Sequence, residues 1–252
     1  MSENQPLSLG KENYQNFAER YAAAIETKPH NAYYERPATL SLLPNNVQGL
    51  RVLDAGCGPG IYTQWLLDLG AEVVACDVTP KMVEITRQRV GNSAEVYCAD
   101  LEQPLTFAGD RSFDLVVCPL VLDYLLDWYP VFCEFFRVLK SDGILVFSCG
   151  HPTADFIYSQ SQNVTSADYF KIEDFVMEWR LFGKPYPIIK SYRRPLQAIL
   201  NPLIQAGFCL DRILEPQPTE SFKIADAEGY EHLMRSPGFI CVRSHKPGQV
   251  VG

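Results

Sequence analysis

Residues 51–60 read Arg-Val-Leu-Asp-Ala-Gly-Cys-Gly-Pro-Gly, and this stretch decides the fold. Val52 and Leu53 predict a buried strand, and glycines at positions 56, 58 and 60 precede an amphipathic segment that begins at Ile61. Because glycine lacks a Cβ, its backbone N–H can approach a ligand closely and its φ can be positive at no steric cost. The stretch therefore predicts a strand, a tight turn and a helix N-terminus that can hold a ligand. A tight turn that binds nothing would use glycines as well.

The segments that follow repeat the alternation of strand and helix. Such repeats with short connections predict a parallel sheet wound by right-handed crossovers, with ligands at the C-terminal edge of the strands. Asp54, Asp77 and Asp100 end the first three strands, so we expect their carboxylates at that edge. After the first strand we expect strands over 72–76, 94–99, 113–118 and 144–147, and a helix from Pro130 to Leu139 that is capped by Asp142-Gly143.

The chain on either side of this core predicts further elements. Apolar residues at helical spacing predict two helices before the first strand, over 11–25 and 32–43. Residues 151–193 are rich in aromatic side chains, and the alternation at 170–179 and 188–192 suggests an antiparallel pair of strands. The remainder predicts a helix over 195–206, a strand over 208–214, a loop with room for one short helix over 215–236, and a last strand over 238–243.

The composition limits the partners of such a fold. Hydrophobic residues make up 47% of the 252 residues and charged residues 21%, as in ordinary globular proteins. The net charge of -8 argues against an extended face that binds nucleic acid, since such faces are basic. One compact basic cluster stands out, formed by Lys190, Arg193 and Arg194.

The cysteines and the first residues indicate the compartment. The eight cysteines are scattered without a Cys-x-x-Cys pair, so they predict buried thiols in a reducing compartment and neither disulfides nor a metal site. Residues 1–10 have neither the basic start nor the apolar core of a signal peptide, and no apolar run reaches the length of a membrane span. We therefore expect a cytoplasmic protein without membrane contact.

The spacing of the glycines indicates the kind of ligand. A dinucleotide site uses Gly-x-Gly-x-x-Gly, whose third glycine lets the helix pack close beneath a pyrophosphate. Here Ile61 stands where that third glycine would be. Asp77 follows Gly56 by 21 positions, where a carboxylate can accept hydrogen bonds from both ribose hydroxyls. The ligand is thus expected to carry a ribose. The glycine turn lacks the spacing that is typical of a pyrophosphate site.

The stretch Val52 to Gly60 resembles motif I of the class I S-adenosylmethionine-dependent methyltransferases. The resemblance extends over residues 47–150 through Asp77, through Ala99-Asp100-Leu101, through Phe113 to Val116, and through Arg137 to Gly143. The tail, with Arg194-Pro195-Leu196 and Ala206-Gly207-Phe208, resembles the small-molecule branch of that family, the type 11-like methyltransferases. The resemblance implies S-adenosyl-L-methionine as methyl donor and S-adenosyl-L-homocysteine as product.

The resemblance also implies roles for individual residues. Gly56, Cys57, Gly58 and Asp54 would hold the methionine part of the cofactor, and Asp77 would hold the ribose. Asp100 would accept from the adenine amino group, Leu101 would offer its backbone N–H, and Val78 and Met82 would pack on the adenine faces. Cys118 and Pro119 would line the far side of the sulfonium. Acidic strand ends also serve as N-caps and turn formers, and Cys118 could simply belong to the core.

Four residues are candidates for the chemistry. Asp123 follows the fourth strand, at a position where relatives often show His, and His151 follows the fifth, so either could be a general base if the acceptor must lose a proton. Tyr21 and Tyr34 could close over the methyl group, although aromatic residues at helical spacing are commonly core residues. Asp123 could instead be an exposed helix residue, and His151 could simply end its strand in a turn.

These expectations combine into one fold and three functional hypotheses. We predict an α/β fold, a doubly wound Rossmann-like sheet that is mostly parallel with an antiparallel last strand, with N-terminal helices and an inserted cap. The first hypothesis is a small-molecule methyltransferase, monomeric or homodimeric, that uses in-line transfer; the others are a catalytically silent cofactor-binding module that acts through a partner, and an NAD-linked oxidoreductase. The single domain would comprise N-terminal helices (1–46), a cofactor-binding core (47–150), a substrate cap (151–193) and the end of the core (194–252).

Overall fold

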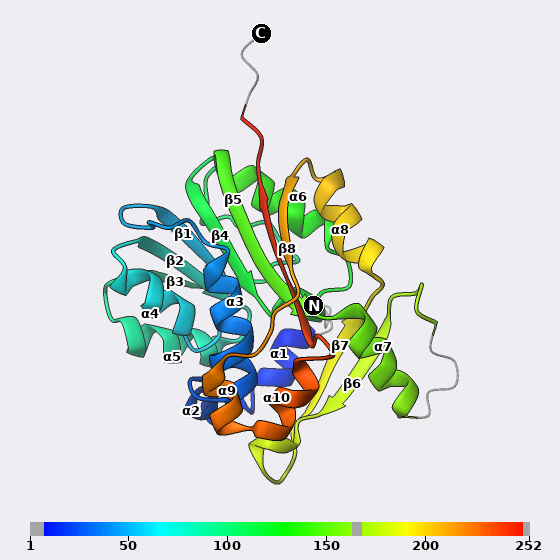
Figure 1. Ribbon diagram of the computed structural model, residues 1–252. Helices are drawn as coiled ribbons and strands as arrows, with labels where there is room; N and C mark the ends of the chain where they lie inside the picture. Colours follow the sequence, from blue (N-terminus) through cyan, green and yellow to red (C-terminus); the bar gives the residue numbers. More distant parts are fainter. Residues whose placement is uncertain (1–7, 163–167, 249–252) are drawn as a thin grey trace, which may run out of the picture.

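The computed structural model describes residues 8–162 and 168–248, and these form a sheet of seven strands in the order β3-β2-β1-β4-β5-β9-β8 (Figure 1). All neighbours pair in parallel except at β9, which runs antiparallel to β5 and β8 on its two sides. The predicted doubly wound sheet with an antiparallel last strand is confirmed. The strands are β1 (Arg51–Ala55), β2 (Glu72–Asp77), β3 (Glu95–Cys98), β4 (Phe113–Pro119), β5 (Leu139–Gly150), β8 (Cys209–Leu214) and β9 (Phe239–His245).

Helices cover both faces of the sheet because successive strand residues point to opposite sides. Leu53 faces a cluster built with α6 (Tyr129–Val138) and α8 (Leu196–Gln205). Its neighbour Val52 faces the other cluster, which includes residues of α3 (Arg36–Ser41) and α4 (Ile61–Asp68). On the same side as α4, α5 (Pro80–Val90) covers Ala75 of β2. The middle strands are therefore fully buried, as their continuous apolar runs require.

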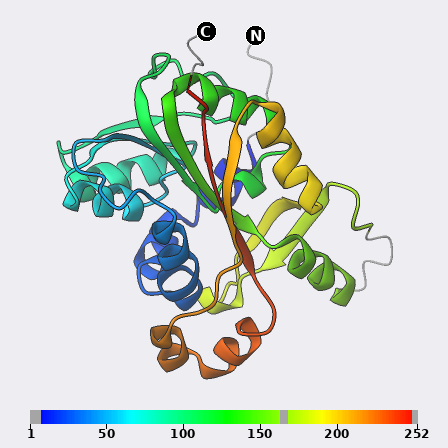
Figure 2. The ribbon, with the colours of Figure 1, turned by 45° about the horizontal axis from the view of Figure 1, so that its top comes forward.

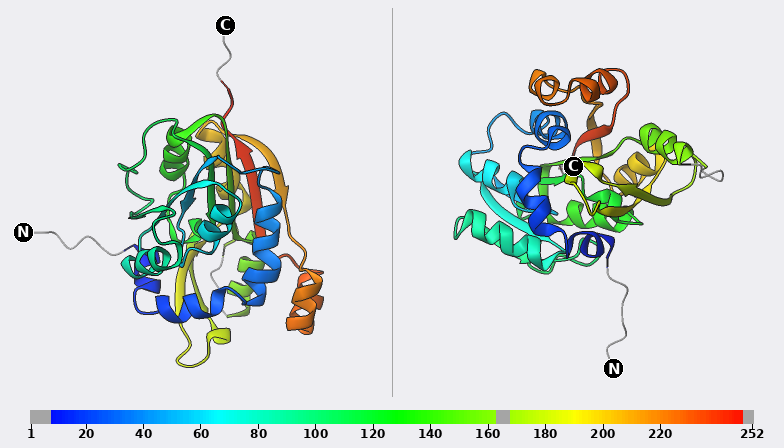
Figure 3. Two further views of the ribbon diagram at one scale, coloured as in Figure 1. Left: turned by 90° about the vertical axis from the view of Figure 1, so that its left-hand side faces the viewer. Right: turned by 90° about the horizontal axis from the view of Figure 1, so that it is seen from below.

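A ring of additional elements surrounds the C-terminal edge of the sheet. Seen from below, the N-terminal helices, the last helices and a two-stranded hairpin lie around this edge (Figure 3). The hairpin is the antiparallel pair β6–β7, and Figure 2 shows α7 beside it and α9 with α10 beneath the start of β9. These elements are α1 (Leu9–Tyr14), α2 (Ala18–Ile25), α7 (Pro152–Ser161), β6 (Glu173–Glu178), β7 (Ile188–Arg193), α9 (Glu220–Ala225) and α10 (Ala227–Leu233).

Several sequence-based boundaries were wrong, each where tertiary contacts decide. The expected helix over 11–25 is two helices, α1 and α2, and that over 32–43 begins as a π-helix, η1 (Asn31–Glu35). The predicted cap at Asp142-Gly143 lies inside β5, because Leu139 already pairs with Phe113 and the Asp142 N–H donates to the Lys246 carbonyl. The segment 215–236 contains two helices where room for one was expected, and α7 was not predicted.

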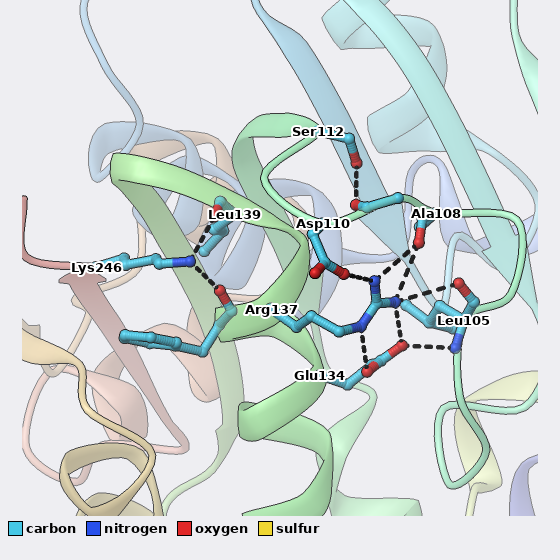
Figure 4. Close-up of polar contacts among 10 residues, drawn as sticks. Leu105, Ala108, Asp110, Ser112, Glu134, Arg137, Leu139 and Lys246 are labelled. Atoms are coloured by element: carbon cyan, nitrogen blue, oxygen red, sulfur yellow. Dashed lines mark hydrogen bonds and ion pairs between the residues drawn. The ribbon is translucent and has the colours of Figure 1, made fainter.

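Arg137 at the end of α6 fastens the loop that follows the third strand (Figure 4). Its guanidinium donates to the carbonyls of Leu105 and Ala108 and pairs with Glu134 and Asp110. Glu134 in turn accepts from the Leu105 N–H at 2.7 Å. Arg137, the first residue of the Arg137 to Gly143 motif, thus fixes the position of the loop that follows β3. It does so from the end of the sheet opposite to the glycine turn.

Candidate functional site

The glycine turn after β1 has positive φ values at Gly56, Gly58 and Gly60. A Cβ on Gly56 would lie 2.4 Å from a Val121 methyl, and one on Gly60 would lie 2.9 Å from Thr86. A Cβ on Gly58 would meet no atom within 4 Å. Two of the glycines are therefore required by close packing, whereas Gly58 borders open space and leaves its backbone accessible to a ligand.

Asp77 ties the end of β2 to this turn. Its Oδ2 accepts from the Gly58 N–H at 2.9 Å and its Oδ1 from the Thr79 N–H at 2.8 Å. Burial raises the pKa of Asp77, and these hydrogen bonds from Thr79 and Gly58 oppose the shift. A carboxylate oxygen has two lone pairs, so both oxygens can still accept from a ligand hydroxyl.

Besides Ser8 Oγ, two buried atoms of charged side chains near the turn have no hydrogen-bond partner among the described residues. One is Asp54 Oδ1; the other oxygen of Asp54 accepts from Thr63 Oγ1 at 2.5 Å. The second is Arg36 Nε, whose guanidinium donates elsewhere to the Ile25 and Glu26 carbonyls. Burial raises the pKa of Asp54 to about 7. Unpaired buried groups are costly, so one acceptor and one cationic donor here fit a ligand with an ammonium and a carboxylate.

A narrow cavity of about 120 Å³ lies over the turn and extends along the sheet edge. It is lined by most of the predicted cofactor residues, which the fold has brought together from four strand ends. Asp54 and Cys118 do not line it; both are fully buried, Cys118 within the core. The predicted residues that line it are Gly56, Cys57, Gly58, Asp77, Val78, Met82, Asp100, Leu101 and Pro119.

The sequence did not point to the side chains that η1 and the first residue of α3 contribute to the narrow cavity. Asn31, Glu35 and Arg36 line it. Glu35 is 2% exposed, and its carboxylate accepts from Ser148 Oγ at 2.6 Å and from Thr39 Oγ1 at 2.7 Å, while burial raises its pKa. In the sequence, Glu35 and Arg36 are two polar residues within an amphipathic segment, and nothing local indicates that they line a cavity. Only the tertiary fold places them over the turn.

A wide cavity of about 950 Å³ adjoins the narrow one. Its walls come from α2, α7, β6, β7 and α10, elements that lie far apart in the sequence. The Tyr14 and Tyr124 hydroxyls, 2.7 Å apart, meet where the cavities touch. The residues common to both linings are Tyr14, Tyr21, Asn31, Leu120 and Tyr124.

Asp123 and Tyr21 line the wide cavity, as a role in the chemistry would require. Asp123 lies in the short helix η2 (Leu122–Tyr124), and its Oδ2 accepts from the Gly150 N–H at 2.9 Å. It is partly buried, so the alternative of an exposed helix residue is wrong. Burial raises its pKa to about 6, against opposing contributions from the Gly150 N–H and Arg194.

His151 and Tyr34 line neither cavity. The His151 ring is occupied on both nitrogens, because Nε2 lies 2.8 Å from Glu215 Oε1 and Nδ1 accepts from the Thr153 N–H as the N-cap of α7. Tyr34 is 1% exposed, and its hydroxyl accepts from the Gly238 N–H at 2.8 Å. The structure thus places His151 at a helix start and Tyr34 in the core.

The basic cluster seen in the sequence is not a surface patch. Lys190 pairs with Glu12, and Arg193 pairs with Glu173 while only 2% exposed. Arg194 stacks over Trp128 at 4.0 Å. Among residues 8–162 and 168–248, no group of three or more His, Cys, Asp or Glu could hold a metal ion. Within the same ranges, none of the helices combines the length and apolar character of a membrane crossing.

The strand order, the glycine turn and the acidic end of β2 together define a Rossmann-like methyltransferase fold. A family model described as a methyltransferase domain matches residues 53–147. Residues 53–147 thus match a methyltransferase domain, and the similarities in sequence and fold support an enzyme with S-adenosylmethionine-dependent methyltransferase activity. These similarities favour a methyltransferase over the alternative of an NAD-linked oxidoreductase.

Individual relatives agree with this assignment. An S-adenosylmethionine-dependent methyltransferase from Mesorhizobium loti superposes with a TM-score of 0.66 at 25% identity, covering 84% of this chain and 97% of that one. A malonyl-[acyl-carrier protein] O-methyltransferase of Acetivibrio thermocellus is 36% identical over 108 residues, 41% of this chain and 37% of the relative. A Haemophilus influenzae protein described as uncharacterized is 27% identical over 86% of this chain and 88% of its own length. The likeness to the O-methyltransferase thus covers less than half of either chain.

Proposed function

We propose that this enzyme transfers a methyl group in line to a small-molecule acceptor bound in the wide cavity. The observation that supports the proposal is the junction of the two cavities at Tyr14, Leu120 and Tyr124. A donor in the narrow cavity and an acceptor in the wide one would meet at this junction. The cap formed by β6 and β7 lines the wide cavity, which favours an acceptor small enough to be enclosed.

The narrow cavity suits S-adenosyl-L-methionine. Asp77 would accept from the ribose hydroxyls, and Asp100, Leu101, Val78 and Met82 would surround the adenine. Arg36 lines the cavity and would receive the carboxylate of the methionine part, whereas Asp54, buried beneath the turn, would act on the ammonium through the turn or a water. When bound, the donor supplies a methyl group attached to a positively charged sulfur. The neutral thioether that remains after transfer is a good leaving group. Pro119 lines the cavity, whereas Cys118 lies beneath it and would act through packing alone.

The main contribution of the protein would be alignment. Holding two reactants in a near-attack geometry can supply about 7 to 11 kcal/mol of the barrier. Asp123, with a pKa near 6, would be ionised at neutral pH and could take a proton from the acceptor, which contributes about 10² to 10⁴-fold. The rings of Tyr14, Tyr21 and Tyr124 would exclude water from the junction.

Two measurements test the proposal in sequence. Calorimetry with S-adenosyl-L-homocysteine should give saturable binding, and a screen of small molecules with a labelled methyl donor should give a labelled product. A folded sample that gives no heat at high micromolar ligand would remove the proposal. Binding without any labelled product, together with capture of a protein on the cap, would favour the silent module.

The surface and the cysteines also bear on the setting. The cations of the sequence cluster are paired or buried, which supports an acceptor other than nucleic acid. All eight cysteines are free thiols, and five of them are buried, which fits the cytoplasmic location that we propose.

A further inference from the structure

The floor of the wide cavity carries two carboxylates that touch the same glycine. Asp123 accepts from the Gly150 N–H, and a Cβ on Gly150 would lie only 2.4 Å from Asp155 Oδ2. Both side chains line the cavity. Asp155 comes from the first turn of α7, an element that the sequence did not predict, so this neighbour of Asp123 appears only in the fold.

Neither carboxylate has a cationic partner in the part of the chain that the structure describes. Two arginines act on the pair only from a distance: Arg193 pairs with Glu173, and Arg194 lies on the Trp128 ring and donates through Nη2 to the Leu125 carbonyl, while its buried Nε has no hydrogen-bond partner among the described residues. The Asp155 carboxylate accepts no hydrogen bond within residues 8–162 and 168–248. Burial is therefore the main influence on both groups and raises the pKa of Asp155 well above its usual range, with a further contribution from Asp123. A partly buried acidic pair without an ion-pair partner favours a cation in the cavity.

The aromatic part of the wide cavity's lining favours a cation as well. Aromatic rings attract ammonium groups through their negative faces. One such contact exists already, because Lys28 Nζ lies 4.7 Å from the centre of the Trp179 ring and 3.9 Å from that of Phe182. The aromatic residues that line the wide cavity are Tyr14, Tyr21, Tyr124, Tyr158, Phe175, Trp179 and Phe239.

The basic side chains of the wide cavity stand on other elements. Lys28 and His30 follow α2, and His232 belongs to α10, whereas Asp123 and Asp155 follow β4 and β5. Arg180 also lines the cavity but pairs with Glu178. The cavity is thus polarised, with its negative side next to Tyr124 and the junction where the methyl group would arrive.

We propose that the acceptor is an amine, held as its ammonium form by Asp123 and Asp155 and methylated on nitrogen. This inference rests on the proposed function. The ammonium gives one proton to the carboxylate pair, and two neighbouring carboxylates readily share a single proton. The freed nitrogen lone pair then forms the N–C bond while the C–S bond breaks, and its electron pair stays on sulfur. A carboxylate acceptor would instead meet two like charges at the reacting end.

The test uses matched acceptors with the whole enzyme. Alkyl and aralkyl amines are compared with the alcohol and the acid of similar shape, for example benzylamine, benzyl alcohol and benzoate, with labelled methyl donor and mass spectrometry of the product. We expect label on nitrogen, and amines that raise the melting temperature of the enzyme saturated with S-adenosyl-L-homocysteine. Label on oxygen or carbon, or no amine that is either labelled or bound, overturns the inference. Failure to bind S-adenosyl-L-homocysteine would instead remove the proposed function.

Isosteric variants separate the roles of the two carboxylates. Asp155→Asn should raise the KM for the amine at least tenfold, with an unchanged affinity for S-adenosyl-L-homocysteine. Asp123→Asn should lower kcat and abolish the rise of activity with pH near 6. Asp174→Asn, at an exposed position of β6 outside both cavities, is the matched control and should behave as the unaltered enzyme. An Asp155→Asn enzyme with an unaltered KM for every amine would contradict the inference, even if the amines are methylated.

Discussion

The narrow and wide cavities differ in how the chain builds them. The narrow cavity is lined by the turn at 56–60 and by short segments after β2, β3 and β4, and the N-terminal helices close its other side. Much of its ligand surface is backbone, and its central carboxylate, Asp77, is held by backbone N–H groups. The wide cavity is made of side chains from elements between Tyr14 and Phe239. The narrow cavity depends on the sheet itself, so the same ligand can bind there in proteins that share the sheet. The wide cavity depends on side chains outside the sheet, so its lining can change without disturbing the sheet.

The two cavities also differ in the state of their carboxylates. Asp77 uses both oxygens to brace the turn, so it supports the ligand site as well as touching it. Asp123 has one hydrogen bond from Gly150. Substitutions in the narrow cavity should therefore change donor binding, and substitutions in the wide cavity should change only the use of the acceptor. The predictions below test this separation.

The largest effect on donor binding is expected at Gly58. Because a Cβ there points into open space, Gly58→Ala should cost only the strain of a positive φ, about 1 to 2 kcal/mol of stability. In the complex the same methyl group would occupy the place of the ligand, and we expect the affinity for S-adenosyl-L-homocysteine to fall about 100-fold or more. Calorimetry measures it. Gly109→Ala, which has neither a close neighbour nor a positive φ, is the control. Undiminished binding in Gly58→Ala would show that the ligand does not lie over the turn.

A somewhat smaller loss is expected at Asp77. Hydrogen bonds to a charged group are worth about 1.5 to 3 kcal/mol, so Asp77→Asn should weaken S-adenosyl-L-homocysteine binding about 10- to 100-fold. Asp123→Asn should leave this affinity within about twofold. If the two substitutions weaken donor binding equally, the separation between the cavities does not hold.

The sequence predicted the narrow cavity better than the wide one for a physical reason. The glycines at 56–60 and the acidic residues at 77 and 100 are local features whose meaning follows from strand order. The antiparallel pair β6–β7 was also foreseen from the alternation of its residues. Asp155, by contrast, acquires its role through α7, which brings it to Gly150. Such proximity depends on tertiary packing and leaves no periodic signal.

The candidate catalytic residues illustrate the same limit. His151 and Asp123 both follow strands that end at the functional edge, so the sequence could not separate them. The fold does, since Glu215 and the Thr153 N–H occupy the His151 ring whereas Asp123 faces the wide cavity. Arg36 was missed because it is one polar residue within an amphipathic segment, and nothing local shows that its Nε is buried without a partner.

The pH dependence of donor binding should depend on Asp54. Its pKa in the free enzyme is about 7, and under the proposed function only an ionised Asp54 would stabilise the ligand ammonium from beneath the turn. The affinity for S-adenosyl-L-homocysteine should thus rise by up to about tenfold per pH unit below 7 and level off above it. Asp54→Asn should flatten this profile.

Ionisation of Asp54 should have the opposite effect on the stability of the free enzyme: the free energy of unfolding should fall with rising pH, whereas the donor affinity rises. The pKa of Asp54 in the folded state lies above its value of about 4 in the unfolded chain. Its contribution to the free energy of unfolding is therefore fully present below pH 4 and is lost as the pH rises through 7. Asp54→Asn, measured by thermal unfolding against pH, should remove the part of the decline between pH 5 and 7 that is due to this residue. An unaltered profile in both binding and unfolding would exclude the raised pKa of Asp54.

The smallest effect is expected at Arg20, which joins α2 to the cap. Its guanidinium donates to the carbonyls of Phe182, Gly183 and Pro185 in the turn between β6 and β7. Arg20→Lys keeps the charge but loses the planar set of donors, so it should release this turn at a cost of about 1 to 2 kcal/mol. Hydrogen exchange of residues 180–186 should quicken, and the KM of the acceptor should rise about two- to fivefold with unchanged donor affinity. Arg235→Lys, at an exposed position and paired with Glu231, is the control. If donor binding weakened as well, the cap would also support the narrow cavity, and the two sites would be coupled through α2.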